Sequence, residues 1–169
     1  LEAYRDFVAL LTPVGFKYIS AKMAETNAVI GGESSGGLAV RGHIAGKDGI
    51  YAAALLVEML AVTGKSVSQL YQEITDKYGM LYYEDAAFTM TQARKVELQE
   101  KLFVKLEVPD FGNAVEKINR TDGCKVYFTD GSWVICRFSG TEPLLRMAAE
   151  GESQSQARTY IRIWREELG

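Results

Sequence analysis

The sequence predicts two kinds of architecture in series: part of an α/β layer over residues 1–64 and a small α+β unit over residues 104–169. Connecting helices and a strand are expected over residues 65–103. The first third alternates helical, strand, glycine-rich and helical patterns. The last third contains a hairpin signal around Asp130 and Gly131, another strand pattern and a closing amphipathic helix.

The composition is that of a globular protein of one or two domains. Of the 169 residues, 47% are apolar and 24% are charged, so the chain can bury a core. The net charge of −3 includes no long basic run, which argues against nucleic acid and membrane surfaces as partners. An anionic ligand must therefore be held by local groups.

Three patterns define the first third. The stretch "GFKYISAKMAE" predicts a helix, and "AVIGGE" predicts a strand entering a glycine-rich loop. A buried helix is expected between an N-cap at Asp48 and a stop at Gly64. Its apolar stretch, Ile50 to Val62, is about a third shorter than the roughly 20 residues that span a bilayer, and it contains Glu58. We therefore interpret it as a core helix.

The middle of the chain begins with a capped helix. In "SVSQLYQEITDKYG", Ser66 and Gln69 form the capping-box pattern, and Gly79 is the expected stop. The aromatic stretch "MLYYEDAAFTMT" predicts a strand or an extended connector. A helix follows from about Thr91 to Leu106, and "VPDFGN" ends it.

The last third predicts three strands followed by a helix. "CKVYFTDGSWVICRF" predicts a hairpin, and "LLRMAAE" predicts a third strand. Ser153 and Gln156 form a second capping-box pattern before the final helix. The apolar stripe of that helix consists of Ala157, Tyr160, Ile161, Trp164 and Leu168.

The two cysteines lie on opposite arms of the hairpin. A two-residue loop at the Asp-Gly turn would set Lys125 opposite Cys136 and Cys124 opposite Arg137. The two sulfurs would then lie on opposite faces of the sheet. We expect free thiols, consistent with a reducing cytoplasm, because the pair also lacks the clustered spacing of a zinc site.

The glycine-rich loop "GGESSGG" is a candidate sugar-binding loop. Its glycines let the backbone approach a ligand closely, and Glu33 offers a carboxylate that can accept from two neighbouring sugar hydroxyls. Ser34 or Ser35 can donate or accept as well. The alternative interpretation is a flexible, polar surface turn.

The stretch "GHIAGKDG" contains Gly-Lys before a helix but is not a nucleotide-binding P-loop. Its spacing is one residue short, and Asp48 stands where a metal-binding Ser or Thr is required. Lys47 is either a solvated charge or, at a helix start, a group for proton transfer. His43 is either a structural histidine or a cleft residue.

The stretch "RFSGTEPLLR" predicts an anion cradle. Arg137 can bind a phosphate through two parallel hydrogen bonds, and Ser139 and Thr141 add hydroxyl donors. Gly140 allows successive backbone N–H groups to turn toward the same oxygens. Arg146 either joins this cluster or pairs with an acidic neighbour. Taken alone, "SGT" also occurs in ordinary turns.

In this order, "TPVGFKYI", "GGESSGG", "GHIAGKDG" and "RFSGTEPLLR" closely resemble the carboxy-terminal half of the α-D-phosphohexomutases, the phosphoglucomutase and phosphomannomutase family. The resemblance covers nearly the whole chain. It implies the end of the third of four domains, followed by the fourth domain, an antiparallel sheet packed with helices like that of the TATA-box-binding protein. The four domains of this family surround a central cleft.

The resemblance also implies roles for particular residues. Glu33 and Ser35 match the sugar-recognition loop, and Lys47 matches a lysine that assists proton transfer in some members. The loop that grips the non-reacting phosphate is matched by Arg137, Ser139, Gly140 and Thr141. Possible cleft residues are Phe16, Lys17 and His43. Other members carry tryptophan or histidine at the position of Phe16, which leaves the choice among glucose, mannose and amino sugars open.

The activity implied by the resemblance is intramolecular phosphotransfer between hexose 1-phosphate and hexose 6-phosphate. It uses a phosphoserine, Mg²⁺ and a hexose 1,6-bisphosphate intermediate that also serves as activator. The chain contains neither a serine loop like "TASHN" nor a metal-binding "DxDxD" run, and it opens at Leu1 within a helical pattern. We therefore expect an inactive substrate-binding portion whose partners are upstream domains. The alternatives are a stand-alone phosphosugar-binding or regulatory module, and a structural domain whose loops are turns.

Overall fold

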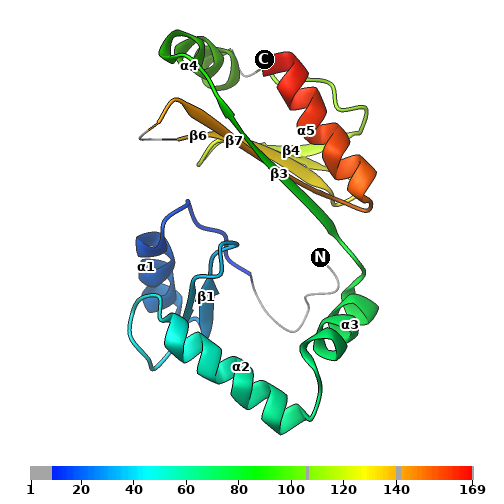
Figure 1. The fold of residues 1–169 in the computed structure, drawn as a ribbon. Coiled ribbons are helices and arrows are strands. Elements are labelled where there is room, and N and C mark those ends of the chain that lie inside the picture. Colours follow the sequence, from blue (N-terminus) through cyan, green and yellow to red (C-terminus); the bar gives the residue numbers. More distant parts are fainter. Residues whose placement is uncertain (1–8, 106, 140–141, 169) are drawn as a thin grey trace. The chain divides into compact units, whose positions relative to one another are not determined.

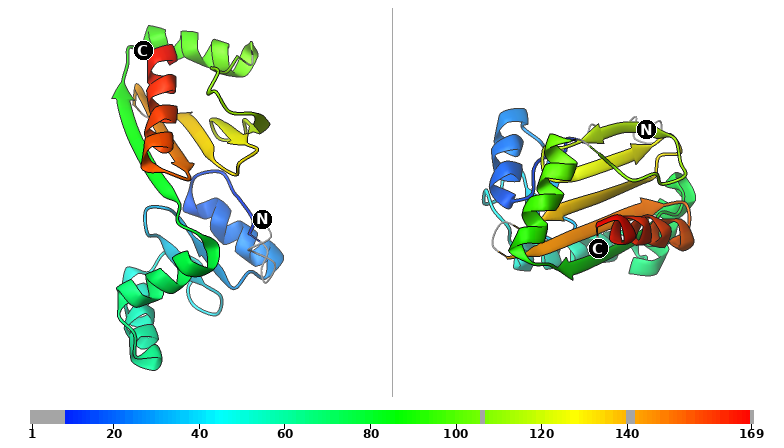
Figure 2. Two further views of the ribbon diagram at one scale, coloured as in Figure 1. Left: turned by 90° about the vertical axis from the view of Figure 1, so that its right-hand side faces the viewer. Right: turned by 90° about the horizontal axis from the view of Figure 1, so that it is seen from above.

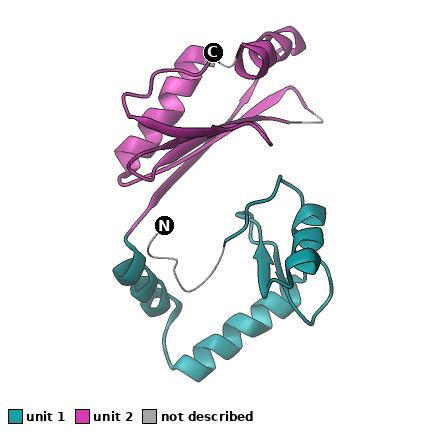
Figure 3. Cartoon of the chain, turned by 180° about the vertical axis from the view of Figure 1, so that it is seen from behind, with its two compact units in different colours: residues 1–79 teal, residues 80–169 magenta. Residues whose placement is uncertain are grey.

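The computed structural model describes residues 9–105, 107–139 and 142–168. The chain divides into two compact units, residues 1–79 and residues 80–169 (Figure 3). Each unit is described by itself.

Unit 1 contains the helices and the strand that the sequence predicts, together with one more strand. The strands β1 (Ile30–Gly32) and β2 (Leu38–Val40) form an antiparallel hairpin. Helix α1 (Phe16–Thr26) packs on β1 so closely that a Cβ at Gly31 would lie 2.5 Å from the sulfur of Met23. Helices α2 (Gly49–Thr63) and α3 (Val67–Tyr78) complete the unit (Figure 1).

The predicted helix ends of unit 1 are confirmed. The Asp48 carboxylate accepts from two backbone N–H groups at the start of α2, and Gly64 ends the helix in the left-handed conformation. Ser66 and Gln69 form the complete reciprocal capping box of α3, which stops at Gly79. These ends follow from local hydrogen bonding, which is why the sequence predicts them well.

The prediction that α2 is buried is wrong. None of its residues is buried, and Ile50 and Val62 are 87% and 80% exposed. The reason is that the described residues of unit 1 supply only the two short strands β1 and β2 as a sheet. Within the described ranges no single helix could cross a membrane, although α2 and α3 together, bent by 82°, meet the length and composition criteria.

Unit 2 is built on one antiparallel sheet of five strands in the order β3-β7-β6-β5-β4 (Figure 2). The strands are β3 (Tyr82–Thr89), β4 (Val115–Asn119), β5 (Cys124–Phe128), β6 (Trp133–Phe138) and β7 (Leu144–Gly151). The helices are α4 (Gln92–Gln99), a π-helical turn (Glu100–Val104) and α5 (Gln154–Leu168).

The compact unit begins earlier than residue 104, where the sequence analysis placed its start. Strand β3 is an integral part of the sheet, since it pairs with β7 from Tyr82 opposite Gly151 to Thr89 opposite Leu144. The sequence analysis did not predict strand β4. It is the edge strand on the other side of the sheet, and four of its five residues are exposed, so its apolar signal is weak.

Helix α5 covers one face of the sheet with the predicted stripe. Ala157, Tyr160, Ile161 and Trp164 are all buried, whereas the side chain of Leu168 lies outside the described residues. The sheet contributes Cys124, Val126, Phe128, Val134, Cys136, Leu145, Met147 and Ala149 to the same core.

The second capping box is only half formed. The hydroxyl of Ser153 accepts from the N–H of Gln156 at 3.1 Å, as the pattern predicts. The side-chain oxygen of Gln156 instead accepts from the N–H of Glu152, one residue before the predicted position.

The predicted hairpin is present, but its predicted register is wrong. Cys124 lies opposite Cys136, so both thiols share the buried face. The loop has three residues, because the N–H of Gly131 donates to the carbonyl of Phe128, and the N–H of Phe128 donates to the carbonyl of Ser132. A type I turn followed by a left-handed glycine has this pattern, and Gly131 has φ 86°. The prediction of free thiols is confirmed.

Candidate functional site

The glycine-rich loop of unit 1 is an ordered hairpin turn. The N–H of Glu33 donates to the carbonyl of Gly37 at 2.9 Å, and the N–H of Gly36 donates to the carbonyl of Glu33 at 3.0 Å. Gly36 has φ 90°, a conformation that favours glycine. The turn therefore fixes the position from which the Glu33 side chain departs.

The β1–β2 hairpin brings three of the sequence-predicted residues together. The carboxylate of Glu33 lies 3.0 Å from the ammonium of Lys47, and that ammonium lies 5.4 Å from the centre of the Phe16 ring. The Glu33 side chain is 18% exposed, whereas that of Lys47 is 53% exposed. A half-buried carboxylate is thus held by a lysine that solvent reaches.

Gly37 makes room for this ion pair. A Cβ at this position would lie 2.5 Å from Cδ of Lys47 and 2.8 Å from the carboxylate of Glu33. Both distances are too short for real contacts, so a side chain here would displace one partner of the pair. The absence of a Cβ at Gly37 is a local requirement of the pair.

His43 is bound to the start of α2. Its Nε2 lies 2.8 Å from one carboxylate oxygen of Asp48, and its ring stacks on Tyr51 with 4.0 Å between the ring centres. The other carboxylate oxygen of Asp48 caps the helix. The hydrogen bond from His43, followed by that from the N–H of Tyr51, lowers the pKa of Asp48. This geometry favours the structural interpretation of His43.

Ser35, Lys17 and His43 are the three unit 1 candidates that the structure does not bring to the Glu33–Lys47 pair. Ser35 is exposed at the tip of the turn. The ammonium of Lys17 lies 4.8 Å from the ring centre of its neighbour Tyr18. Within the described part of unit 1, the hydrogen bond to the Glu33 carboxylate comes from Lys47.

The candidate phosphate loop joins β6 to β7. The N–H of Ser139 donates to the carbonyl of Leu144 at 2.8 Å, which closes the loop at its base. The hydroxyl of Ser139 accepts from the N–H of Glu142 at 3.3 Å. Gly140 and Thr141 lie outside the described residues. The described part of the loop is therefore held by its own backbone.

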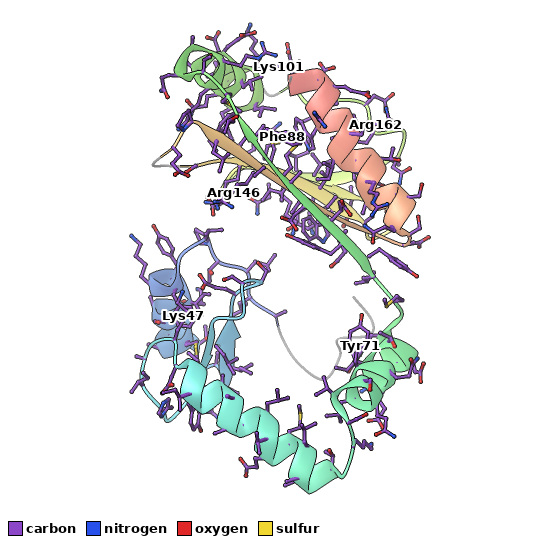
Figure 4. All side chains as sticks on the ribbon, in the orientation of Figure 1. Lys47, Tyr71, Phe88, Lys101, Arg146 and Arg162 are labelled. Atoms are coloured by element: carbon purple, nitrogen blue, oxygen red, sulfur yellow. The ribbon has the colours of Figure 1, made fainter. Side chains whose placement is uncertain are left out.

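Two arginines face each other at the base of this loop. Arg137 on β6 is the register partner of Arg146 on β7. Both side chains lie on the sheet face opposite the core, and Figure 4 shows Arg146 on the side away from α5. Like charges in opposite positions repel, so an anion near them would stabilise the pair. Within the described ranges, Arg146 has no ion pair with an acidic residue.

Sequence reasoning left the role of Arg146 open, and it missed Lys95. The ammonium of Lys95, on α4, donates to the carbonyl of Ser139 at 2.8 Å. The strand register is what reveals Arg146, whereas Lys95 is 44 residues from Ser139 in the sequence, and no local pattern indicates the contact.

The resemblance implies that magnesium is bound by upstream parts of the protein and not by this chain. Across residues 9–105, 107–139 and 142–168, no group of three or more His, Cys, Asp or Glu side chains is arranged to hold a metal ion. No step of the chemistry below is therefore assigned to a metal in this chain.

Two family models match the chain. The model described as "Phosphoglucomutase/phosphomannomutase, alpha/beta/alpha domain III" matches residues 3–78. The model described as "Phosphoglucomutase/phosphomannomutase, C-terminal domain" matches residues 90–163. Together they cover most of the sequence. The first range lies within unit 1 and the second lies within unit 2.

Relatives and solved structures of the same kind are similar to the chain. A phosphoglucomutase/phosphomannomutase of Thermococcus kodakarensis is 35% identical over 90% of this chain and 31% of its own length. A probable phosphoglucosamine mutase of Methanothermobacter thermautotrophicus is 31% identical over 89% of this chain and 32% of its own length. A putative phosphomannomutase structure from Thermus thermophilus has a TM-score of 0.69 at 26% identity, covering 93% of this chain and 30% of its own.

Proposed function

Because the chain belongs to the phosphoglucomutase/phosphomannomutase family, we propose that it is the sugar- and phosphate-binding part of a phosphohexomutase. The chain spans about a third of the length of the relatives it matches. The proposed reaction of the whole protein is the interconversion of hexose 1-phosphate and hexose 6-phosphate. The family is of the mutase type, an isomerase class.

The opposed arginines at the base of the β6–β7 loop are the observation that supports this proposal most directly. Arg137 and Arg146 are register partners on the sheet face opposite the core of unit 2, and the Ser139 hydroxyl belongs to the loop that follows. A dianionic phosphate would relieve their mutual repulsion and accept bidentate hydrogen bonds. We assign the non-reacting phosphate of the substrate to this site, with Gly140 and Thr141 as further contacts.

We assign the sugar to the Glu33 loop. An ionised carboxylate is an acceptor with two oxygens, so it can bind two neighbouring ring hydroxyls at once. In the free protein it accepts from Lys47, whose long side chain is half exposed and can move aside. Ser35, at the tip of the same turn, is the proposed second contact to the sugar. We also propose Lys17 and His43 as outer residues of the substrate-binding cleft.

Lys47 is the proposed aid to proton transfer. Once the sugar hydroxyls occupy the Glu33 carboxylate, the ammonium of Lys47 is released next to the reacting end of the ligand. It can then give a proton to an oxygen that is losing its phosphoryl group, and the neutral amine left behind can take the proton of a hydroxyl that attacks. Phe16 keeps the ammonium near this position through its ring.

The remaining chemistry belongs to parts of the protein outside this chain. In the proposed cycle a phosphoserine gives its phosphoryl group to the sugar, which becomes a hexose 1,6-bisphosphate. The other phosphate then returns to the serine, so the loop must hold the remote phosphate in both orientations. Binding that remote group positions the reacting one. Mg²⁺ would be bound by those other parts, and we expect the chain alone to be inactive.

The proposal is tested by NMR titration of the 169-residue chain with glucose 6-phosphate and with mannose 6-phosphate. We expect amide shifts at Ser139 and at Glu33, and loss of binding in the variant Arg137→Met. The control is Arg162→Met, since Arg162 pairs with Glu166 on α5. Equal affinity of both variants would contradict the phosphate assignment.

A second measurement separates a mutase from a binding module. Phosphorus NMR follows hexose 1-phosphate after mixing with the intact protein that carries this chain, with Mg²⁺ and a trace of hexose 1,6-bisphosphate. We expect the 6-phosphate signal to appear, and the fastest of the glucose, mannose and amino-sugar forms to identify the substrate. Binding without conversion would favour the stand-alone phosphosugar-binding or regulatory module.

A further inference from the structure

The loop that joins β6 to β7 is held from outside by the β3–α4 segment, residues 90–95, which runs from the end of β3 into α4. The N–H of Met90 donates to the carbonyl of Pro143 at 2.9 Å, near the end of the loop. The ammonium of Lys95 donates to the carbonyl of Ser139 at 2.8 Å, at its start. One short segment therefore contacts both ends of the loop.

We propose that Lys95 is a positioning residue for phosphate binding, which makes the β3–α4 segment part of the phosphate site. The proposal rests on the proposed function of the β6–β7 loop. Lys95 does not touch the substrate. It acts through the carbonyl of Ser139, by fixing the orientation of this group at the start of the loop and by adding positive charge beside it.

The orientation of Lys95 differs from that of an ordinary surface lysine. Its neighbour Arg94 pairs with Glu97 on the same helix at 2.6 Å, which is the usual local pairing. Lys95 instead contacts a residue 44 positions away, and this hydrogen bond is partly buried. A partly buried bond from a charged donor is stronger than an exposed neutral one.

The other polar groups of Ser139 explain why the carbonyl matters. Its N–H is used at the base of the loop by the carbonyl of Leu144, and its hydroxyl accepts from the N–H of Glu142. The carbonyl is the group that Lys95 binds, so the lysine adds a contact from α4 to the two contacts that Ser139 makes within the loop.

The lysine also changes the charge at the loop. Its ammonium adds a third positive charge to those of Arg137 and Arg146. Attraction between opposite charges acts over several bond lengths, so Lys95 supports an anion bound at the loop without touching it.

The test compares three substitutions of Lys95 with a control. Lys95→Met removes both the charge and the donor, Lys95→Gln keeps a donor without charge, and Lys95→Arg keeps both. The control is Lys105→Met, because Lys105 is exposed and lies 4.0 Å from Glu100. Affinity for glucose 6-phosphate and for inorganic phosphate is measured on the 169-residue chain by NMR titration.

We expect Lys95→Met to lower phosphate affinity about tenfold, the effect of one charge-assisted hydrogen bond. The phosphate affinity of Lys95→Gln should lie between those of Lys95→Met and wild type. Lys95→Arg should restore most of the affinity, and Lys105→Met should change the affinity little. The gain in affinity as phosphate loses its second proton, near about pH 6 to 7, should be smaller in Lys95→Met than in wild type. A packing role alone would not change this pH dependence.

Each outcome decides between the two proposals. If the wild-type chain binds neither ligand, the proposed function of the loop fails and this inference with it. If wild type binds and Lys95→Met binds equally well, the inference is overturned while the phosphate site stands. If Lys95→Met loses affinity but Lys95→Arg does not restore it, and the pH dependence is unchanged, the lysine contributes packing only and the inference is again overturned.

Discussion

The turn at Glu33–Gly37 in unit 1 and the turn at Phe128–Ser132 in unit 2 have the same backbone. In each, the first residue donates its N–H to the carbonyl of the fifth, and the fourth donates to the carbonyl of the first. The fourth residue is a glycine, with φ 90° at Gly36 and 86° at Gly131. Each turn also carries one carboxylate, Glu33 in the first and Asp130 in the second.

The two carboxylates differ in how many donors they already serve. Asp130 accepts from the N–H and the hydroxyl of Ser132 at 2.9 and 2.5 Å, and from the amides of Asn113 and Gln156 at 2.8 and 2.9 Å. Glu33 accepts from Lys47 alone among the described residues. The difference shows that the saturation of the acceptor, and not the type of turn, separates a structural carboxylate from a candidate ligand site.

The largest effect is expected from removing the saturated carboxylate. Asp130→Ala leaves the donors of Ser132, which is 4% exposed, without their acceptor. The free energy of unfolding of unit 2 should fall by about 1 to 3 kcal/mol. Urea unfolding followed by tryptophan fluorescence measures it, because Trp133 and Trp164 both belong to unit 2.

Glu33→Ala is the matched variant in the other turn. Glu33 belongs to unit 1, so the same fluorescence transition should not move, while binding of hexose phosphates is lost. A comparable fall in the stability of unit 2 would contradict the distinction between the two carboxylates.

The next effect comes from the glycines of the two turns. Gly131→Ala should destabilise unit 2 by about 1 kcal/mol, because only backbone strain opposes the change and no atom lies within 4 Å of the added Cβ. In unit 1, the Cβ added by Gly36→Ala likewise has no atom within 4 Å. It should leave the tryptophan-monitored transition in place and weaken sugar binding, as read by NMR titration. If Gly36→Ala shifted the tryptophan-monitored unfolding transition as much as Gly131→Ala does, the two turns would not be independent.

A smaller effect is expected from acid. Burial raises the pKa of Asp130, but hydrogen bonds from Ser132 and Gln156 outweigh it, so the pKa lies below the ordinary value of 3.8. A carboxylate with a lowered pKa stabilises the fold above its unfolded value, and this contribution disappears as pH falls through the folded value. The urea midpoints at about pH 5 and about pH 3 should differ less in Asp130→Asn than in wild type. Identical pH dependence in both proteins would refute this.

The smallest effect concerns the cysteines of the unit 2 hairpin. Burial raises the pKa of both thiols, and only the thiolate reacts with disulfide reagents. The native chain should therefore show almost no labelling, whereas Cys124 and Cys136 should both react in urea. Labelling of one thiol in the native chain would restore the register that the sequence predicts, with the sulfurs on opposite faces.

Features that depend on neighbours in sequence could be predicted. The ends of α2 and α3, the Asp-Gly turn and the stripe of α5 all follow from local hydrogen bonding or helical spacing. The hairpin register could not be predicted, because Asp130-Gly131 suits both a two-residue and a three-residue loop. Strand β4 was missed because an exposed edge strand needs few apolar residues.

The candidate site divides in the same way. Glu33 and Arg137 could be proposed from the sequence because their residue types and local loops indicate sugar and anion binding. Their partners depend on pairing between strands or contact between distant elements. The β1–β2 hairpin brings Lys47 to Glu33, strand pairing places Arg146 opposite Arg137, and the fold of unit 2 carries Lys95 to Ser139. None of these contacts can be derived from spacing alone.

The pairing of β3 with β7 has a consequence for how the chain folds. β3 is the first strand of the sheet to be synthesised and β7 is the last, yet they pair along their whole length. Loop-closure entropy makes such distant pairing slow compared with the local β5–β6 hairpin. On the ribosome, β3 must wait without its full partner until residue 151 has emerged, so the β6–β7 loop would be assembled in the last stage of folding.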